Sequence, residues 1–127
     1  MLTLSLVQTA GAGQFEDELL VLINRYRSTK KLKPLTGYPL YYDLAREHSR
    51  DMQKRQDMDH DGFDGRFRRA VDARSCVENV GWNHETPQSL FDAWRKSPGH
   101  NRNMLDRKIK RAGINKTGPY STFFACY

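Results

Sequence analysis

The hydrophobic pattern of this chain changes near residue 109, and no other feature of the sequence constrains the fold as strongly. Upstream of that point, apolar residues recur at the three- and four-residue spacing of amphipathic helices. Downstream, residues 109–115 and 120–127 alternate as strands do, and Gly118 and Pro119 lie between them as a turn. Helices followed by a terminal β-hairpin indicate an α+β domain.

Three amphipathic helices are expected before the hairpin. The first covers residues 15–28, the second follows Pro39, and the third begins at Thr86, a good N-cap with Pro87 in the first helical position. The second helix carries His48 on its apolar face, which predicts a core histidine with one hydrogen-bond partner. The remaining links are expected to be a loop at 30–39, a polar loop at 57–65, a helical turn at 66–71 and an extended segment at 77–82.

The third helix is interrupted by Ser97-Pro98-Gly99, because proline and glycine disfavour a helix interior. We expect Trp94 to complete the buried stripe of that helix. His100 is then expected in an irregular segment, and residues 101–105 are expected to form one further turn.

A chain of 127 residues is large enough for one hydrophobic core, and no apolar run approaches the roughly 20 residues of a membrane-spanning helix. Residues 15–127 are expected to form the domain, with residues 1–14 as an N-terminal extension. The extension resembles the end of a signal peptide but lacks a basic start. The alternation of residues 2–7 favours an edge strand instead.

The net charge is +6, but the cations are spread along the chain among acidic residues. No nucleic-acid motif accompanies them, so we expect solvated faces and no nucleic-acid partner. Attraction to an acidic surface, such as anionic lipid or polysaccharide, is kept as an alternative. The cationic segments are Arg25-Tyr26-Arg27, Lys30-Lys31, Arg66–Arg69 and Arg107–Arg111.

The two cysteines, Cys76 and Cys126, lack the short spacing of a zinc knuckle or a redox pair. A bond between them would close a loop of about 50 residues, which the loop-entropy model values at roughly 4 kcal/mol. Asn115-Lys116-Thr117 is a glycosylation sequon. Both features are compatible with an exported protein.

Acidic residues alternate in Asp57-x-Asp59-x-Asp61-Gly62, as in the first half of a calcium loop. The twelfth position of such a loop needs a bidentate acid, and here it is Arg68. The acids therefore favour a solvated turn over a calcium site. The chain has no GxSxG or HExxH motif, and neither cysteine lies in a recognisable catalytic context.

His60, Glu78 and His100 are the candidate ligands that remain, and none is expected within a helix. Neutral imidazoles are common ligands of zinc and copper, and a carboxylate can complete or orient such a site. On spacing alone, unrelated surface histidines are the simpler interpretation.

Five stretches occur in a characteristic order: LAREHSRDM (44–52), the His60 loop, VENVGW (77–82), AWRKSPGHNRNML (93–105) and FFACY (123–127). Together they resemble the CAP superfamily, which comprises cysteine-rich secretory, antigen 5 and pathogenesis-related class 1 proteins. The likeness covers nearly all of the chain from about residue 15. It implies an α-β-α sandwich, in which helices flank a small central antiparallel sheet.

The resemblance also implies a cleft that holds two histidines and two acids. Carried over to this chain, these are His60, Glu78 and His100, with zinc expected on the two histidines. The family's second acid is a glutamate between the first histidine and Glu78, and this chain has none there. Asp64 or Asp72 is expected to substitute for it.

The last residues, Cys126-Tyr127, resemble the family's terminal C-x-Y strand. We infer a disulfide from Cys126 to Cys76, which is not a family pairing.

The resemblance implies an exported, non-enzymatic binding module with a zinc-competent cleft. Lipid, sterol or a cell-surface or extracellular protein is its expected partner. A second hypothesis is a metal-dependent hydrolase that cleaves peptides or esters, with Glu78 as the base for a zinc-bound water. A third is a structural subunit of an extracellular complex, joined to another chain through the strand at residues 2–7.

Overall fold

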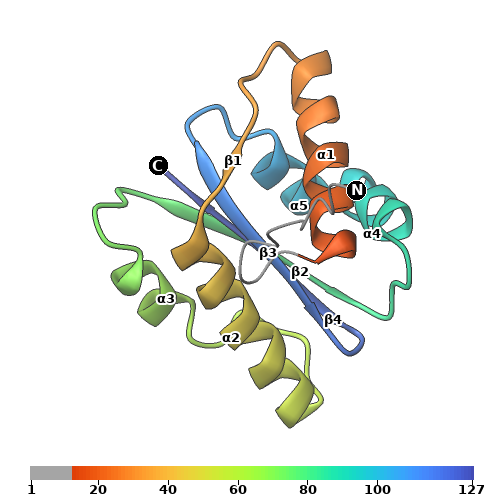
Figure 1. The fold of residues 1–127 in the computed structure, drawn as a ribbon, viewed down its shortest axis with the longest axis vertical. Helices are drawn as coiled ribbons and strands as arrows, with labels where there is room; N and C mark the ends of the chain where they lie inside the picture. The colour runs from red at the N-terminus through yellow and green to blue at the C-terminus, as the bar shows by residue number, and fades with distance from the viewer. Residues whose placement is uncertain (1–12) are drawn as a thin grey trace, which may run out of the picture.

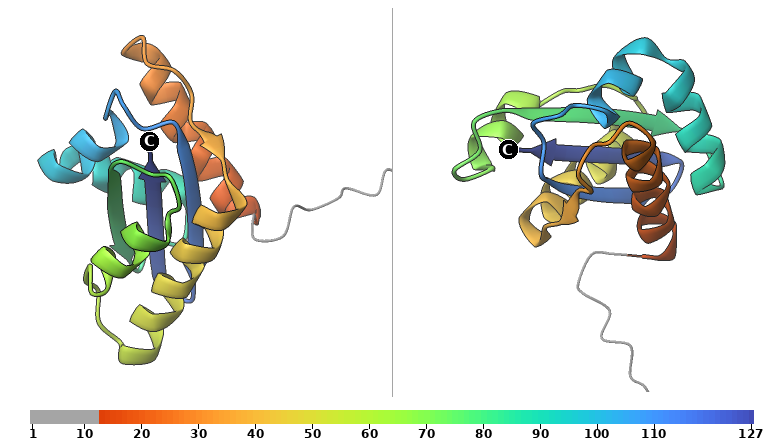
Figure 2. Two further views of the ribbon diagram at one scale, coloured as in Figure 1. Left: turned by 90° about the vertical axis from the view of Figure 1, so that its left-hand side faces the viewer. Right: turned by 90° about the horizontal axis from the view of Figure 1, so that it is seen from above.

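The computed structural model describes residues 13–127, which form three layers with a sheet between two groups of helices (Figures 1 and 2). Helices α2 and α3 cover one face of the sheet, and α1, α4 and α5 cover the other (Figure 1). The predicted α+β class and α-β-α sandwich are confirmed. The elements are α1 (Gln14–Thr29), β1 (Thr36–Gly37), α2 (Pro39–Arg55), α3 (Phe63–Arg69), β2 (Cys76–Trp82), α4 (Pro87–Lys96), α5 (Pro98–Met104), β3 (Arg111–Thr117) and β4 (Tyr120–Cys126).

The sheet has four strands in the order β1-β3-β4-β2. Strands β3 and β4 form the predicted hairpin, with Thr117 opposite Tyr120, and β4 pairs antiparallel with β2. Strand β1 differs from the expected loop, because Thr36 and Gly37 pair parallel with β3. A strand of two residues carries no alternation in the sequence, so only its hydrogen-bond partner reveals it.

Strand β4 lies in the middle of the structure, and all of its residues are buried. Its side chains alternate between the two faces: Phe123 and Ala125 pack against α1 and α4, whereas Phe124 and Cys126 pack against α2 and α3. A strand covered on both faces reads as a continuous apolar run, which FFAC illustrates.

The expected break at residues 97–99 is instead a junction between two helices. Helix α4 has the predicted N-cap, since Thr86 Oγ1 accepts a hydrogen bond from the Ser89 N–H at 3.1 Å. Ser97 ends α4 in an extended conformation (φ −100°, ψ 116°) and is the N-cap of α5. Pro98 occupies the first position of α5, where a missing N–H costs nothing. His100 therefore lies in a helix, and its assignment to an irregular segment was wrong.

Strand β2 is an edge strand, and side chains satisfy its outer backbone groups. The Val80 carbonyl accepts a hydrogen bond of 3.0 Å from the buried indole of Trp94, and the Glu78 carbonyl accepts one of 3.2 Å from Asn103. Such covering prevents an edge from pairing with another chain. It also holds α4 and α5 against the edge of β2.

Cys76 and Cys126 form a disulfide, as inferred from the sequence. They face each other directly in the β2–β4 register, and their Cα atoms are 4.1 Å apart. The bond ties the start of β2 to the end of β4.

Among residues 13–127, no helix is long and apolar enough to cross a membrane. The edge strand expected at residues 2–7 and most of the proposed N-terminal extension lie outside the described residues.

Candidate functional site

The site is built around Glu78, which lies in the edge strand β2. Its side chain is only 1 % exposed, and both carboxylate oxygens are engaged. Arg66 on α3 forms a bidentate ion pair with it, at 2.7 Å from Nε to Oε2 and 2.7 Å from Nη2 to Oε1. His60 Nδ1 lies 2.9 Å from Oε1. Glu78 therefore links the loop before α3 to the sheet.

Arg66 is the residue of this site that the sequence did not reveal. It was grouped with solvated charges, yet it is buried. Its Nη1 donates to the Asp61 carbonyl at 2.7 Å, and Nη2 lies 3.4 Å from the His60 carbonyl. The guanidinium thus holds the loop that carries His60. The one signal for Arg66 in the sequence was the absence of the family's second glutamate, which left open which side chain contacts Glu78.

The environment keeps Glu78 ionised. Burial disfavours its charge, but hydrogen bonds from His60 and Arg66 and the charge of Arg66 outweigh this effect, so the pKa of Glu78 is lowered. An ionised carboxylate accepts a hydrogen bond from His60, which places the proton of the neutral ring on Nδ1.

This hydrogen bond sets the orientation of His60. The side chain is 52 % exposed, and Nε2 is left as the available nitrogen. Metal-binding histidines commonly donate the other ring N–H to a carboxylate in this way.

His100 approaches the same edge of β2 from the other layer of helices. Its ring lies over Trp94, with centroids 6.3 Å apart, and its backbone carbonyl accepts a hydrogen bond from Asn79 at 3.1 Å. Burial lowers the pKa of His100, and the charge of nearby His60 lowers it further. The hydrogen bond from Asn79 holds the His100 backbone against β2, one residue beyond Glu78, although 40 positions separate His100 from His60 in the chain.

Comparison with known proteins decides the family. The model of the cysteine-rich secretory protein (CAP) family matches residues 20–127, which is most of the chain. The chain belongs to this family.

Relatives with known sequence or structure agree with this assignment. YkwD, an uncharacterized protein of Bacillus subtilis (strain 168), is 27 % identical over 111 residues, which are 83 % of this chain and 43 % of YkwD. An extracellular protein with an SCP domain from Bacillus anthracis superimposes with a TM-score of 0.82 at 24 % identity, over 87 % of this chain and 39 % of that one. A cysteine-rich secretory protein from Staphylococcus aureus has a TM-score of 0.82 at 19 % identity, over 94 % and 40 %. This chain thus spans less than half of each relative.

Neither of the two aspartates expected as the second acid is joined to Glu78. Asp64 is exposed on α3 and Asp72 is exposed beyond it, and neither contacts Glu78 through a hydrogen bond or ion pair in the described residues. The side chain that pairs with Glu78 is Arg66. This CAP chain therefore pairs the glutamate of its E-N motif with a cation rather than with another acid.

Asn115 of the sequon is also placed unfavourably for modification. It is buried in β3, and its side-chain oxygen accepts a hydrogen bond from Thr117 Oγ1 at 2.6 Å. Glycosylation needs an exposed asparagine, so the folded domain does not present this one.

The donor set of the cleft is limited to nitrogen. Within residues 13–127, no group of three or more His, Cys, Asp or Glu side chains is arranged to hold a metal. Both carboxylate oxygens of Glu78 already form hydrogen bonds with Arg66 and His60. Glu78 orients His60, whose Nε2 takes no part in these hydrogen bonds. The cavity beside His60 and Glu78 has a volume of about 300 Å³, and Asn103 of α5 also lines it.

In the acidic loop predicted to be a solvated turn, the carboxylate of Asp59 forms several hydrogen bonds. Asp59 accepts two hydrogen bonds from Arg55, at 2.8 and 3.0 Å, and a third from the Asp61 N–H at 3.0 Å. Its carboxylate therefore has cationic and backbone partners from its own neighbourhood.

His48 is confirmed as a core histidine with one hydrogen-bond partner, and it predicts a pH effect. The residue is 1 % exposed, its Nε2 lies 2.7 Å from the Asp59 carbonyl, and burial lowers its pKa in spite of the nearby Glu78 charge.

Because this pKa is lowered in the folded protein, His48 binds a proton at a higher pH in the unfolded chain than in the folded one. The free energy of unfolding therefore decreases as pH drops below the ordinary histidine pKa of about 6.5. We expect a lower urea midpoint at pH 5.5 than at pH 7.5, with a smaller decrease in His48→Gln. Equal decreases in both proteins would contradict this.

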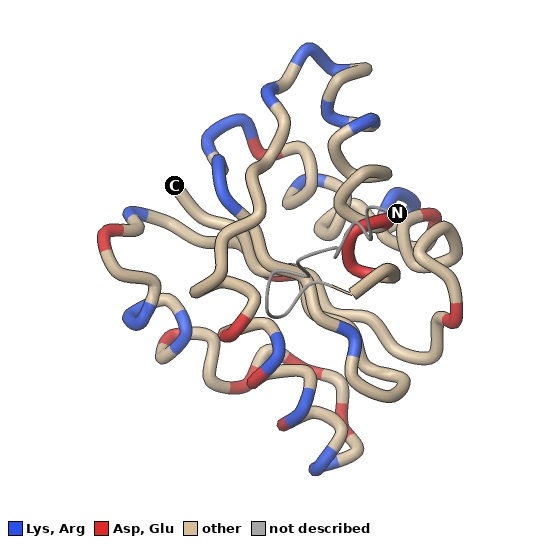
Figure 3. The backbone as a smooth tube through the Cα atoms, in the orientation of Figure 1, with Lys and Arg blue, Asp and Glu red and all other residues tan. Residues whose placement is uncertain are grey.

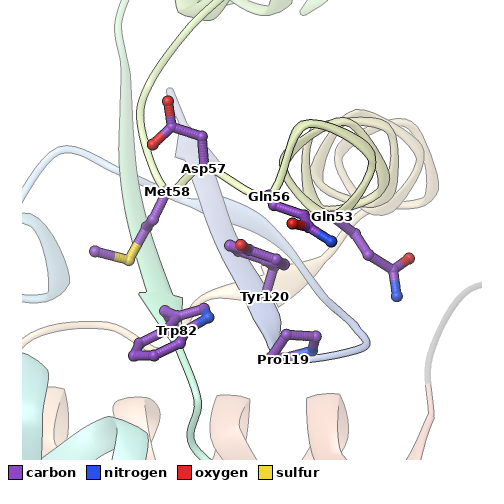
Figure 4. Close-up of a pocket in the computed structure, with 7 residues that line it drawn as sticks. All are labelled: Gln53, Gln56, Asp57, Met58, Trp82, Pro119 and Tyr120. Atoms are coloured by element: carbon purple, nitrogen blue, oxygen red, sulfur yellow. The ribbon is translucent and has the colours of Figure 1, made fainter.

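A second groove, of about 600 Å³, lies at the other end of β2 (Figure 4). Met58 and Trp82 line one side of it, Gln53 and Gln56 line the other, and Tyr120 lies between them. Trp82 is 53 % exposed, which is unusual for so large an apolar side chain.

Proposed function

We propose that this chain is an extracellular binding module whose cleft holds a divalent metal through His60 and His100. The hydrogen bond of 2.9 Å between His60 Nδ1 and Glu78 carries the proposal, because it leaves the lone pair of Nε2 free to bind a metal. The lowered pKa of His100 supports it, since a neutral imidazole is the form that binds a metal. A bound zinc ion would supply an electrophilic centre to which an anionic or carbonyl ligand could bind.

A binding role is better supported than hydrolysis. A hydrolytic base needs a carboxylate oxygen free to accept a proton from water. Glu78 has both oxygens in short hydrogen bonds to a buried guanidinium, and its pKa is lowered, so it is a weak base. The metal-dependent hydrolase remains the alternative, and zinc-dependent turnover of peptides or esters that is lost in Glu78→Gln would favour it.

Zinc titration by calorimetry tests the metal site. We expect the wild type to bind one zinc ion, and His60→Ala and His100→Ala each to bind it at least tenfold more weakly. His84→Ala is the matched control, because His84 hydrogen-bonds Ser89 at the start of α4 rather than facing the cleft. Equal affinities in the wild type and His100→Ala, or an equal loss in His84→Ala, would contradict the proposal.

Lipid or sterol binding is a second candidate, favoured by the exposed indole of Trp82 in the groove beside Met58. We expect radiolabelled cholesterol or oleate to bind the wild type and His100→Ala alike, and to bind Trp82→Gln more weakly. Retention of full binding by Trp82→Gln would exclude this groove.

A further inference from the structure

Two cationic segments that are distant in the sequence meet at one end of the molecule. The first is residues 30–36, which follow α1, and the second is residues 105–111, which lead into β3. The Thr36 N–H donates to the Lys110 carbonyl at 3.0 Å, and Thr36 pairs with Arg111 in the sheet. The parallel pairing of β1 therefore aligns the two segments side by side.

A buried arginine holds both segments in place. Arg27 on α1 donates to the Lys33 carbonyl at 2.9 Å, to the Met104 carbonyl at 2.9 Å and to the Asp106 carbonyl at 2.8 Å. Only 1 % of this residue is exposed. The relative position of the segments is thus set before any ligand binds, which lowers the cost of binding.

The two segments enclose a furrow with a volume of about 510 Å³, which we call the basic furrow. Four exposed cations line it, two from each segment, and none of them forms an ion pair with the described part of the chain. The one acid in the two segments, Asp106, directs a carboxylate oxygen to the Lys108 N–H. Lysines and arginines are visible on both segments in Figure 3. The cations are Lys31, Lys33, Arg107 and Lys110.

The positive charge of the basic furrow is not balanced by acidic side chains in the described part of the chain. Like charges held close together repel one another, and an anion relieves that repulsion. The cations lie on both sides of a concave surface, so a chain of anions lying in the furrow would meet them along its length.

We propose that the basic furrow binds a linear anionic polysaccharide. The exposed large apolar side chains of residues 13–127 are Val21, Met58, Val71 and Trp82, and none of them lies at the furrow. A membrane-binding surface would need such side chains to enter the bilayer. No aromatic ring lines the furrow, so it lacks the stacking platform of a single-stranded nucleic-acid site. Sulfates, phosphates or carboxylates on a sugar chain match the lysine and arginine donors without either feature.

The proposal is independent of the metal site, with which the furrow shares no residue. Fluorescence anisotropy with a labelled heparin oligosaccharide, measured over a range of salt concentrations, tests it. The furrow variant is Lys31→Gln/Lys33→Gln/Lys110→Gln. The control variant, Lys54→Gln/Arg95→Gln/Lys96→Gln, removes the same charge from exposed cations outside the furrow. All six side chains are exposed, so both variants are expected to melt as the wild type does.

We expect the furrow variant to bind heparin at least tenfold more weakly near physiological salt, and the control variant to stay within about threefold of the wild type. The slope of log affinity against log salt should decrease by about 2 to 3 in the furrow variant, because each lost cation releases one counterion fewer. Equal weakening in both variants would show attraction to net charge and overturn the proposal. So would furrow-dependent binding to phosphatidylglycerol vesicles or to oligo-dT that is tighter than binding to heparin.

Discussion

Replacing Gly113 with alanine is expected to cost about 3 kcal/mol or more, or to prevent folding altogether. Gly113 lies in β3, where α2 crosses the sheet at its closest approach. A Cβ atom at this position would overlap the backbone of Tyr41 and Tyr42 in the first turn of α2. Backbone atoms within a helix cannot move aside as a side chain can, so the whole helix would have to lift from β3 and β4.

Gly65→Ala is the matched control for this prediction. A Cβ atom on Gly65 meets no heavy atom within 4 Å, and the residue lies inside α3, where alanine is favoured over glycine. Urea unfolding monitored by circular dichroism should place Gly65→Ala at or above the wild-type stability and Gly113→Ala far below it. Similar midpoints for the two variants would mean that α2 does not pack on β3 as described.

Replacing Arg66 with methionine is expected to cost about 3–5 kcal/mol, because it leaves the charge of Glu78 buried without its partner. Methionine has a similar length and keeps the packing of the aliphatic part, so the loss reports on the ion pair. The remaining hydrogen bond from His60 compensates only part of the charge. The pKa of Glu78 should rise in this variant, since the opposing effect of burial then dominates.

The double variant Arg66→Met/Glu78→Gln separates the ion pair from general damage to the core. Removing both charges avoids the unpaired carboxylate, so the double variant should be more stable than Arg66→Met alone. The measurements are the free energies of unfolding of the wild type, both single variants and the double variant, combined in a double-mutant cycle. Additive losses would show that Arg66 and Glu78 do not interact in the folded protein.

Arg66 also gives the cleft a different charge from the one that the sequence motifs indicate. The sequence resemblance implies two acids beside two histidines, which is a strongly anionic site. The structure has one carboxylate, that of Glu78, neutralised by one guanidinium, that of Arg66. The cleft therefore carries less negative charge than two unpaired acids would give it.

Local patterns in the sequence were sufficient for most of the fold. The alternation around Gly118 and Pro119 predicted the hairpin, and Thr86-Pro87 predicted the start of α4. His48 was placed in the core from the apolar face of one helix. Each of these features depends on residues within one or two turns of each other, so the sequence alone contains the information. The order and spacing of the family motifs then predicted the α-β-α sandwich and the membership of the chain in the CAP family.

The tertiary structure alone decided which charges are paired. From the sequence, Arg66 and the lysines near residues 31 and 110 were equivalent solvated cations. In the folded chain, Arg66 is buried against Glu78, whereas the four cations of the basic furrow are exposed and gathered at one end. Likewise, Asp64 was a candidate for the cleft, yet the turn of α3 directs Arg66 there instead. The reason is that hydrophobic periodicity reports which face of an element is buried, but an electrostatic partner is set by distances between elements that are far apart in the chain.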